Sequence, residues 1–462
     1  MHGYKTFEIG GVHPPDNKLT ADRAIQDLPL PAQVAIPVAQ HIGKPAEIVV
    51  ERGTEVKVGT LLAKASGFIS APIHSSVSGK VKKIDTVVDA QGYRRQAVLI
   101  TVAEDEWEPS IDTSPDVIED ITASAEEIVA RIGDAGVVGA GGATFPTAVK
   151  YSIPEGKTVD TLIINGVECE PYLTTDHRLM LEQAEELIVG TRILMRALGV
   201  GRGWIGIENN KPEAIEHLDT VLAQKREAGL IPEGNLQVLP LHVKYPQGGE
   251  KQLIQAATGR EVPSGKLPLD VGCVVSNVST TLSVYQAVQK QRPFIDRIVT
   301  VTGKDLVAAG NGGNFRVRVG TPVSALVEAV GGMPDTTGKV VMGGPMTGKS
   351  ITSFDVPITK GAGGLIFISA EEARRQEVHN CIRCSRCVSA CPMGLEPYLL
   401  EKLCQSERWE DAEREGVMDC IECGSCNFTC PSNRPILDWL RLGKAQVGAL
   451  RRSRAAAARA GK

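Results

Sequence analysis

Hydrophobic and polar residues alternate with a period of two over roughly the first quarter of this 462-residue chain. Apolar runs such as 46–50 and 97–102 are short, and glycine, proline and other turn residues separate them. Because successive side chains of a strand point to opposite faces, this pattern is typical of an all-β unit. We therefore predict β structure over residues 1–112.

The pattern changes beyond residue 115, where stretches of helical period alternate with short continuous apolar runs. The predicted helices are an acidic one ending near Arg131 and two more at 179–198 and 212–228. The predicted strands cover 161–165, 204–208 and 236–243. Such alternation builds a mostly parallel sheet, and the carboxyl ends of its strands border a ligand crevice. Residues 115–262 are thus predicted to form a Rossmann-like α/β domain whose chemistry lies on its loops.

The last third of the chain mixes several patterns. Residues 263–350 carry β runs at 298–302 and 315–319 near a helix-like segment at 322–330, and glycine clusters at 343–344 and 361–364 predict a linker. Residues 395–415 have a helical pattern with one apolar face. The tail, 441–462, contains arginine and lysine but no acidic residue. We expect an alanine-rich basic helix there; the alternative is a segment that docks on an acidic partner or an anionic membrane surface.

Eight of the eleven cysteines lie within residues 365–440, in two runs with the spacing C-x2-C-x2-C-x3-C-P. In two-cluster ferredoxins the first three cysteines of a run hold one [4Fe–4S] cluster, and the fourth ligates the other. The predicted ligand sets are therefore Cys381, Cys384, Cys387 and Cys430 for one cluster, and Cys391, Cys420, Cys423 and Cys426 for the other. Zinc is the alternative, but a tetrahedral zinc site does not explain why each run has a third cysteine and a Cys-Pro pair.

The two cysteine loops differ in charge. Arg383 and Arg386 lie within the first loop, whereas Glu422 lies within the second. Nearby cations favour the reduced state of a cluster, so we expect the first cluster to be the more easily reduced one. Screening of these charges by solvent is the competing interpretation.

Composition narrows the class of protein further. The formal net charge of −5 argues against nucleic acid as a partner. Clusters held by thiolates persist in a reducing compartment, so Cys169, Cys273 and Cys404 are expected to be small buried side chains. No stretch reaches the roughly 18 apolar residues of a membrane helix, so any membrane association is expected to come through a partner.

A glycine-rich loop, Gly139-Ala140-Gly141-Gly142, lies before the first predicted strand of the α/β domain and leads into Phe145-Pro146-Thr147. Glycines let the backbone approach a phosphate, and Pro146 suits the first turn of a helix whose amides would hold the anion. Lys150, about one turn later, can add a positive charge. On its own, a purely structural glycine turn explains the loop equally well.

Together with the next strand, this loop resembles the flavin-binding subunit of respiratory complex I. In that family the glycine loop also ends in Phe-Pro-Thr, and the motif Asn-x-x-Glu-x-Glu-Pro follows, as Asn165, Glu168 and Glu170 do here. The resemblance implies that the loop holds the phosphate of FMN and that these three side chains border the isoalloxazine ring. It also implies that Phe145 and Glu170 lie on the face where nicotinamide stacks.

The chain departs from that family at three places. Ala140 stands where the family has arginine, Thr144 stands where it has glycine, and the family's Gly-Glu-Glu keeps only its second carboxylate, Glu250. The resemblance implies cofactor binding, with no side chain as catalytic acid or base, by Gly139, Gly141, Gly142, Phe145, Lys150, Asn165, Glu168, Glu170 and Glu250.

The first domain resembles the barrel-sandwich fold of biotinyl and lipoyl domains, but no lysine stands at the hairpin near Ser66 and Gly67 where those families are modified. We expect a scaffold without a prosthetic group. The order of barrel, flavin domain, β-grasp domain at 263–350 and two-cluster ferredoxin-like α domain at 365–440 resembles the C subunit of the Rnf electron-transport complex. This multidomain α/β and α+β likeness covers about residues 1–440.

That resemblance implies a peripheral subunit on the cytoplasmic side of the inner membrane. It would exchange hydride between NAD(H) and non-covalent FMN and pass single electrons through two [4Fe–4S] clusters. The implied partners are the other Rnf subunits and, through them, a ferredoxin-type carrier. Two alternatives remain open at this point: a cobalamin reductase of bacterial microcompartments, and a non-catalytic electron-transfer scaffold.

Overall fold

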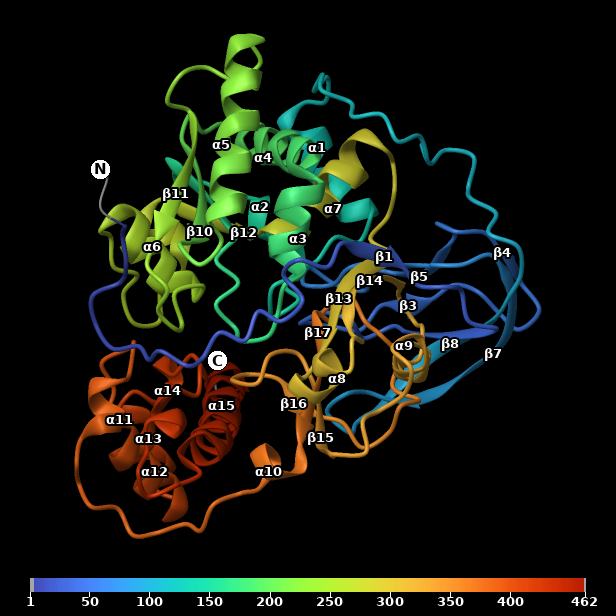
Figure 1. Ribbon diagram of the computed structural model, residues 1–462. Coiled ribbons are helices and arrows are strands. Elements are labelled where there is room, and N and C mark those ends of the chain that lie inside the picture. Colours follow the sequence, from blue (N-terminus) through green and yellow to red (C-terminus); the bar gives the residue numbers. More distant parts are fainter. Residues whose placement is uncertain (1–3, 461–462) are drawn as a thin grey trace.

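The N-terminal β unit is a sandwich of two antiparallel sheets in the computed structural model, which describes residues 4–460 (Figure 1). One sheet has the order β2-β8-β7-β4 and the other β3-β5-β6. Apolar side chains that alternate along the strands fill the space between them, among them Val34, Ile36 and Ile100. The predicted β unit is confirmed. Its strands are β2 (Gln33–Pro37), β3 (Glu47–Ile48), β4 (Glu55–Val56), β5 (Leu61–Lys64), β6 (Ile73–His74), β7 (Gly79–Val88) and β8 (Arg94–Val102).

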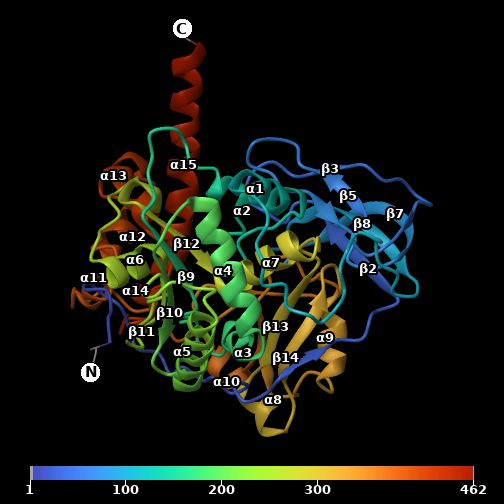
Figure 2. The same cartoon turned by 90° about the horizontal axis from the view of Figure 1, so that it is seen from above.

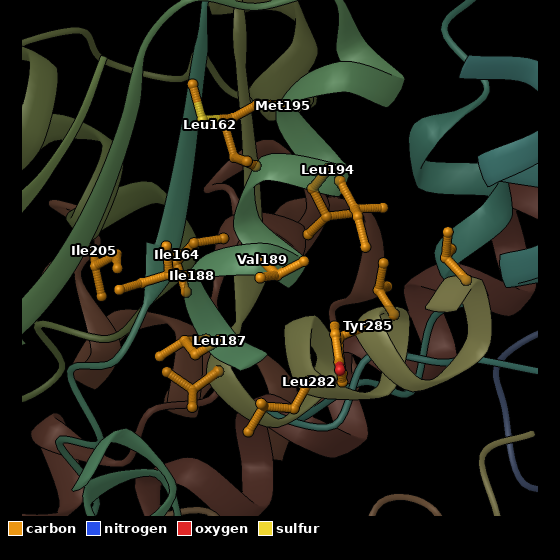
Figure 3. Close-up of a cluster of buried hydrophobic side chains, with 14 of the residues drawn as sticks. Leu162, Ile164, Leu187, Ile188, Val189, Leu194, Met195, Ile205, Leu282 and Tyr285 are labelled. Atoms are coloured by element: carbon orange, nitrogen blue, oxygen red, sulfur yellow. The ribbon is translucent and has the colours of Figure 1, made fainter. Parts of the chain in front are cut away.

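The α/β unit contains a four-stranded parallel sheet in the order β11-β10-β9-β12. Figure 3 shows the core formed where β9 and β10 face α4 and α7, with Leu162, Ile164, Ile188 and Leu282 buried between them. The strands are β9 (Thr161–Asn165), β10 (Gly203–Glu208), β11 (Leu236–Leu241) and β12 (Cys273–Asn277). The helices are α1 (Ala125–Asp134), α2 (Thr147–Tyr151), α3 (Thr175–Glu182), α4 (Ala184–Leu198), α5 (Pro212–Glu227), α6 (Glu250–Thr258), α7 (Val278–Gln289) and a 3-10 turn (Pro268–Val271).

Two features of this unit differ from the sequence-based expectation. The sheet extends past residue 262, because β12 pairs with β9 and leads directly into α7. The predicted helix at 179–198 is two helices, which separate at Gln183, where the backbone leaves helical geometry. Both helices pack against α5 and α7, and the contact between α4 and α7 is the most extensive of these.

A six-stranded mixed sheet, in the order β1-β14-β13-β17-β15-β16, forms the third unit. Its strands come from distant parts of the chain, since β1 pairs with β14 and β17 lies between β13 and β15. The central strand β17 begins at Gly364, the last residue of the glycine cluster at 361–364, so the chain enters the sheet directly there. The elements are β1 (Ile25–Asp27), β13 (Asp296–Thr302), β14 (Gly313–Arg318), β15 (Thr337–Met342), β16 (Lys349–Ser350), β17 (Gly364–Ser369), α8 (Lys304–Ala308), α9 (Val323–Ala329) and α10 (Ala370–Ala373).

The C-terminal unit is helical, and its last helix projects away from the rest of the molecule (Figure 2). The predicted helix at 395–415 is two helices, because Glu407, at φ +55°, interrupts it. The elements are α11 (Arg386–Ser389), α12 (Pro397–Gln405), α13 (Trp409–Arg414), a 3-10 turn (Val417–Asp419), α14 (Ser425–Phe428) and α15 (Ile436–Ala460).

The basic tail is helical along α15, as expected, and part of its charge is compensated. Arg451 and Arg454 form ion pairs with Glu413 on α13 at 2.6 and 2.7 Å. Lys462, also part of the predicted tail, lies outside the described residues.

The N-terminal segment connects three of the units. Val12 forms an antiparallel bridge with Tyr245 of the α/β unit, and the amide of Gly11 donates to the carbonyl of Ala390 in the helical unit at 3.0 Å. The chain then reaches β1 in the mixed sheet. Figure 1 shows this blue segment running between the green α/β unit and the red helical unit. The segment therefore contacts both the α/β unit and the helical unit.

Candidate functional site

A cavity of about 600 Å³ lies where the β sandwich, the α/β unit and the mixed sheet meet. The sandwich contributes His41, Asp89 and Arg95 to its lining. The α/β unit contributes the glycine loop, the loop after β9 and Asn277, and the mixed sheet contributes Arg297 and two glycine-rich segments at 342–349 and 357–363. The cavity is thus built from chain segments that are hundreds of residues apart.

The structure brings together five of the nine predicted cofactor-binding residues. Gly141, Gly142, Asn165, Glu168 and Glu170 line this cavity. The remaining four, Gly139, Phe145, Lys150 and Glu250, are not part of the cavity lining.

Lys150 has a partner within the chain. Its ammonium group forms an ion pair with Glu250 at 2.8 Å and donates to the carbonyl of Val275 at 3.0 Å. The charges of Lys150 and Glu250, both predicted to contact the cofactor, therefore compensate each other.

The glycine loop is fastened to the first turn of α7. The amide of Ala140 donates to the hydroxyl of Thr280 at 2.8 Å, and the amide of Gly139 donates to the carbonyl of Phe145 at 2.9 Å, which closes the loop. A Cβ at Gly141 would lie 3.0 Å from the amide carbon of Asn277. A larger residue at Gly141 would therefore force the side chain of Asn277 to move by a few tenths of an ångström, because the loop and the N-terminal end of α7 approach closely.

Glu168 binds the N-terminal end of α3. Its carboxylate accepts from the amides of Asp176 and His177 at 2.8 and 3.1 Å and from the hydroxyl of Thr175 at 3.0 Å. The free amides at a helix start attract a negative charge. The residue is held at φ +46°, a costly conformation for a side chain with a Cβ. Glu168 therefore lines the cavity while its charge is used to position α3.

Glu170 is enclosed by the turn between β15 and β16. Its carboxylate accepts from the amide of Met346 at 3.0 Å and from the hydroxyl of Thr347. A Cβ at Gly344 would collide with this carboxylate, so only glycine fits there. Burial raises the pKa of Glu170 above its ordinary value. The sequence did not indicate this contact, since the turn lies 174 residues or more from Glu170.

Lys18 anchors the loop that carries these two acids. Its ammonium group donates to the carbonyls of Glu168, Glu170 and Leu173 at 2.7, 3.0 and 2.7 Å. Part of the side chain reaches the surface, but the charged end is enclosed, and this burial lowers the pKa of Lys18 to about 8. No motif in the sequence pointed to this lysine.

Asp176, at the start of α3, is the most buried acid of the cavity. Its carboxylate accepts from the side chains of Asn277 and Ser279 at 2.6 and 2.9 Å. Burial, followed by the nearby charge of Glu168, raises the pKa of Asp176 to about 6. Asn277 and Ser279 are functional candidates that the sequence analysis missed; the signal available was a polar run directly after the strand at 273–277.

The cysteines form two groups in the helical unit. Cys381, Cys384, Cys387 and Cys430 line a separate cavity of about 230 Å³ that opens beside the exposed Cys384. In the other group, burial, reinforced by the thiols of Cys423 and Cys391, raises the pKa of Cys420 to about 11. Within residues 4–460, no three His, Cys, Asp or Glu side chains converge as a site for a single metal ion.

The second cysteine group lies against the α/β unit. The hydroxyl of Tyr245 donates to the carbonyl of Cys423 at 2.8 Å, and the side-chain amide of Gln252 donates to the carbonyl of Pro392 at 3.1 Å. Met346, whose amide holds Glu170, packs in the same small cluster as Tyr245 and Cys423. A short chain of packed residues thus joins the large cavity to this cysteine group.

The charge difference between the cysteine loops is smaller than the sequence suggested. Glu422 accepts from Lys444 at 2.8 Å and from Arg441 at 3.2 Å, both on α15. These cations neutralise the acid that distinguishes the second loop. The expectation that the first cluster is reduced more easily therefore rests on Arg383 and Arg386 of the first loop alone, because the charge of Glu422 is compensated.

Two family models match the chain. The Nuo51 FMN-binding domain matches residues 132–286, and the RnfC barrel sandwich hybrid domain matches residues 5–105. The fold and the cavity thus define a multidomain protein of mixed α/β structure, with a barrel-sandwich domain followed by an FMN-binding domain of the complex I type.

Relatives identify the family. The C subunit of a proton-translocating ferredoxin:NAD(+) oxidoreductase complex from Clostridium ljungdahlii is 42% identical over 88% of this chain and 86% of its own length. Its Na(+)-translocating counterpart from Acetobacterium woodii is 41% identical over 98% of both chains, and the C subunit of an ion-translocating oxidoreductase complex from Rhodobacter capsulatus is 41% identical over 87% and 75%. The chain belongs to the family of C subunits of the Rnf ion-translocating ferredoxin:NAD(+) oxidoreductase complex, which confirms the predicted resemblance.

Solved structures support the fold alone. An NAD+-reducing [NiFe]-hydrogenase in its H2-reduced state superposes with a TM-score of 0.51 at 18% identity, covering 73% of this chain and 65% of that one. The air-oxidised state gives a TM-score of 0.52 over 72% and 69%. Across residues 4–460, no helix has both the length and the apolar character needed to span a bilayer.

Proposed function

We propose that this chain is the subunit at which NAD(H) exchanges a hydride with FMN and from which single electrons leave through two [4Fe–4S] clusters. The observation that carries the proposal is the packed connection between the cavity and a cysteine group through Met346 and Tyr245. Flavin in such a cavity changes a two-electron transfer into two single-electron transfers.

The cavity fits FMN in size and in chemistry. Its volume is in the range of cofactor sites, and it combines a glycine loop with a helix N-terminus, as sites for phosphate esters do. Asn165 lies at the carboxyl end of β9, where ligands of parallel sheets bind. Glu170, kept less acidic by burial, faces the same space. We assign flavin contacts to the predicted residues that line the cavity, and a positioning role to Lys150 and Glu250.

The cysteine groups fit two clusters. Cys381, Cys384, Cys387 and Cys430 surround a space of about 230 Å³ rather than a point, which suits a cluster better than a single ion. Cys391, Cys420, Cys423 and Cys426 are mutually close enough to influence one another's ionisation. Within residues 365–440, the helical unit that follows β17 and α10 is the proposed ferredoxin-like domain, and the mixed sheet is the proposed β-grasp domain.

The two groups have an order. The group with Cys423 touches the α/β unit and the N-terminal segment, whereas Cys384 of the other group is exposed. The inner group is therefore the proposed neighbour of the flavin, and the outer group the proposed outlet towards other Rnf subunits. A peripheral position on the cytoplasmic face of the membrane complex follows from the family and is part of the same proposal.

Anaerobic purification of the full chain tests the proposal. We expect about eight iron atoms, about eight acid-labile sulfides and one FMN per chain, with the flavin bleached by NADH. Cys384→Ser should lower the iron content to about half while flavin is retained, and Cys404→Ala, at a buried cysteine outside both groups, should change neither. A wild-type protein with full iron content whose flavin is absent or unreactive towards NADH would instead indicate the electron-transfer scaffold.

A further inference from the structure

Arg297 is a buried arginine that faces the glycine loop from another domain. It belongs to β13 of the mixed sheet, outside the residues matched by the FMN-binding family model, and only 4% of it is exposed. Its guanidinium donates from Nε to the carbonyl of Ala362 at 2.9 Å and from Nη2 to the carbonyl of Ala140 at 3.2 Å. Within the described residues, no hydrogen bond engages its third nitrogen, and the residue lines the large cavity.

The glycine loop lacks a positive charge of its own. Ala140 occupies the position where the resembling complex I family has arginine, and Lys150 is paired with Glu250. The other arginine lining the cavity, Arg95, is on the sandwich side and is paired with Asp89 at 2.8 Å, and Lys349 lines the cavity from β16. Arg297 is thus the cation that contacts the loop directly.

The same corner contains the start of a long helix. Asn277 caps α7, and the loop amide of Ala140 is bound by Thr280 in the first turn. The capping residue Asn277, the loop backbone and a guanidinium therefore all line the cavity. Buried arginine is the side chain best suited to phosphate, because its planar group donates several hydrogen bonds in fixed directions.

We propose that Arg297 completes a phosphate-ester subsite with the glycine loop and the N-terminal end of α7, and that it binds the phosphate of FMN. The inference rests on the proposed flavin function and adds a residue from a second domain. Flavin binding then depends on the docking of the mixed sheet against the α/β unit. The isolated α/β unit would lack the charge that the cofactor requires.

A purely structural role is the competing explanation, since Arg297 also joins Ala140 to Ala362. The two roles differ in what they predict for a flavin without phosphate. Loss of an anion contact weakens FMN and spares riboflavin, whereas loss of cavity shape weakens both equally. The comparison needs only dissociation constants, measured by quenching of flavin fluorescence in flavin-depleted, full-length protein under anaerobic conditions.

Arg297→Gln should raise the dissociation constant of FMN roughly 10- to 100-fold, the range for a hydrogen bond to a charged group, and change that of riboflavin less than about 3-fold. Arg292→Gln is the matched control, because this half-buried arginine forms an ion pair with Asp296 and does not line the cavity. It should alter the affinities of FMN and riboflavin by the same factor.

Arg297→Lys keeps the charge and serves as the milder variant if Arg297→Gln fails to fold. Its affinity for FMN should fall about 3- to 10-fold, and its affinity for riboflavin should not change. Equal losses for FMN and riboflavin, or no loss for either, would overturn the assignment of Arg297. Wild-type protein that binds neither flavin would instead overturn the proposed function, so the two failures are distinguishable.

Discussion

Replacement of Lys18 by methionine tests whether one ammonium group holds the loop that presents Glu168 and Glu170 to the cavity. Methionine keeps an unbranched apolar stem but donates no hydrogen bond, so the carbonyls of Glu168, Glu170 and Leu173 lose their common donor. The loop should open more often, and each opening removes two of the residues that line the cavity. Flavin affinity should therefore fall although Lys18 itself does not line the cavity.

The expected size follows from two opposing contributions. Three hydrogen bonds from a charged donor stabilise the loop by about 1.5–3 kcal/mol each, or roughly 4.5–9 kcal/mol together. Burial lowers the pKa of Lys18 from 10.5 to about 8, and keeping the ammonium charged there costs about 3 kcal/mol. The net contribution is about 1–6 kcal/mol. Water that reaches the freed carbonyls favours the low end, so we expect FMN affinity to fall roughly 5- to 50-fold.

The assay is FMN binding to flavin-depleted full-length protein, with iron content measured in parallel. Lys5→Met is the matched control, because Lys5 lies in the same N-terminal segment and donates to the carbonyl of Ala257 at 3.2 Å, away from the loop. The control should bind FMN as the wild type does. FMN affinity of Lys18→Met equal to that of the control would refute the anchoring role.

Three further outcomes are expected. Gly344→Ala should displace Glu170 and lower flavin occupancy, with a packing cost of about 1–3 kcal/mol, whereas Gly201→Ala, which has open space around it, should not. Burial raises the pKa of Asp176 from 3.8 to about 6, so the stability it contributes is fully present below about pH 4 and is lost as pH rises from there to about 6; the melting temperature of Asp176→Asn relative to wild type should rise over that range and level off above it. Glu413→Gln should speed amide exchange in the outer turns of α15 without changing the melting temperature, because it removes ion pairs with two arginines there.

The parts of this molecule that depend on local sequence could be predicted, and those that depend on distant contacts could not. The apolar run at 161–165 coincides with β9, because a buried parallel strand is continuous in its hydrophobicity. The glycine loop is also marked locally and lies at the cavity. Lys18, Arg297 and Gly344 carry no such mark, since each acts on a partner more than 100 residues away. The ion pair of Lys150 with Glu250 was not foreseen for the same reason, since Glu250 lies on another element.

The N-terminal segment also affects the order in which contacts form while the protein is being synthesised. Gly11 leaves the ribosome early, yet its partner Ala390 is about 380 residues further along the chain. At a translation rate of roughly 5–20 residues per second, the segment waits about 20–80 s for that contact. The β sandwich can fold during this time. β1 is also made long before its partner β14, and the two strands can pair as soon as β14 has formed. A nascent chain stalled before residue 240, where the partners of Lys5 and Val12 begin, should therefore leave residues 4–12 open to proteolysis, whereas the completed chain protects them.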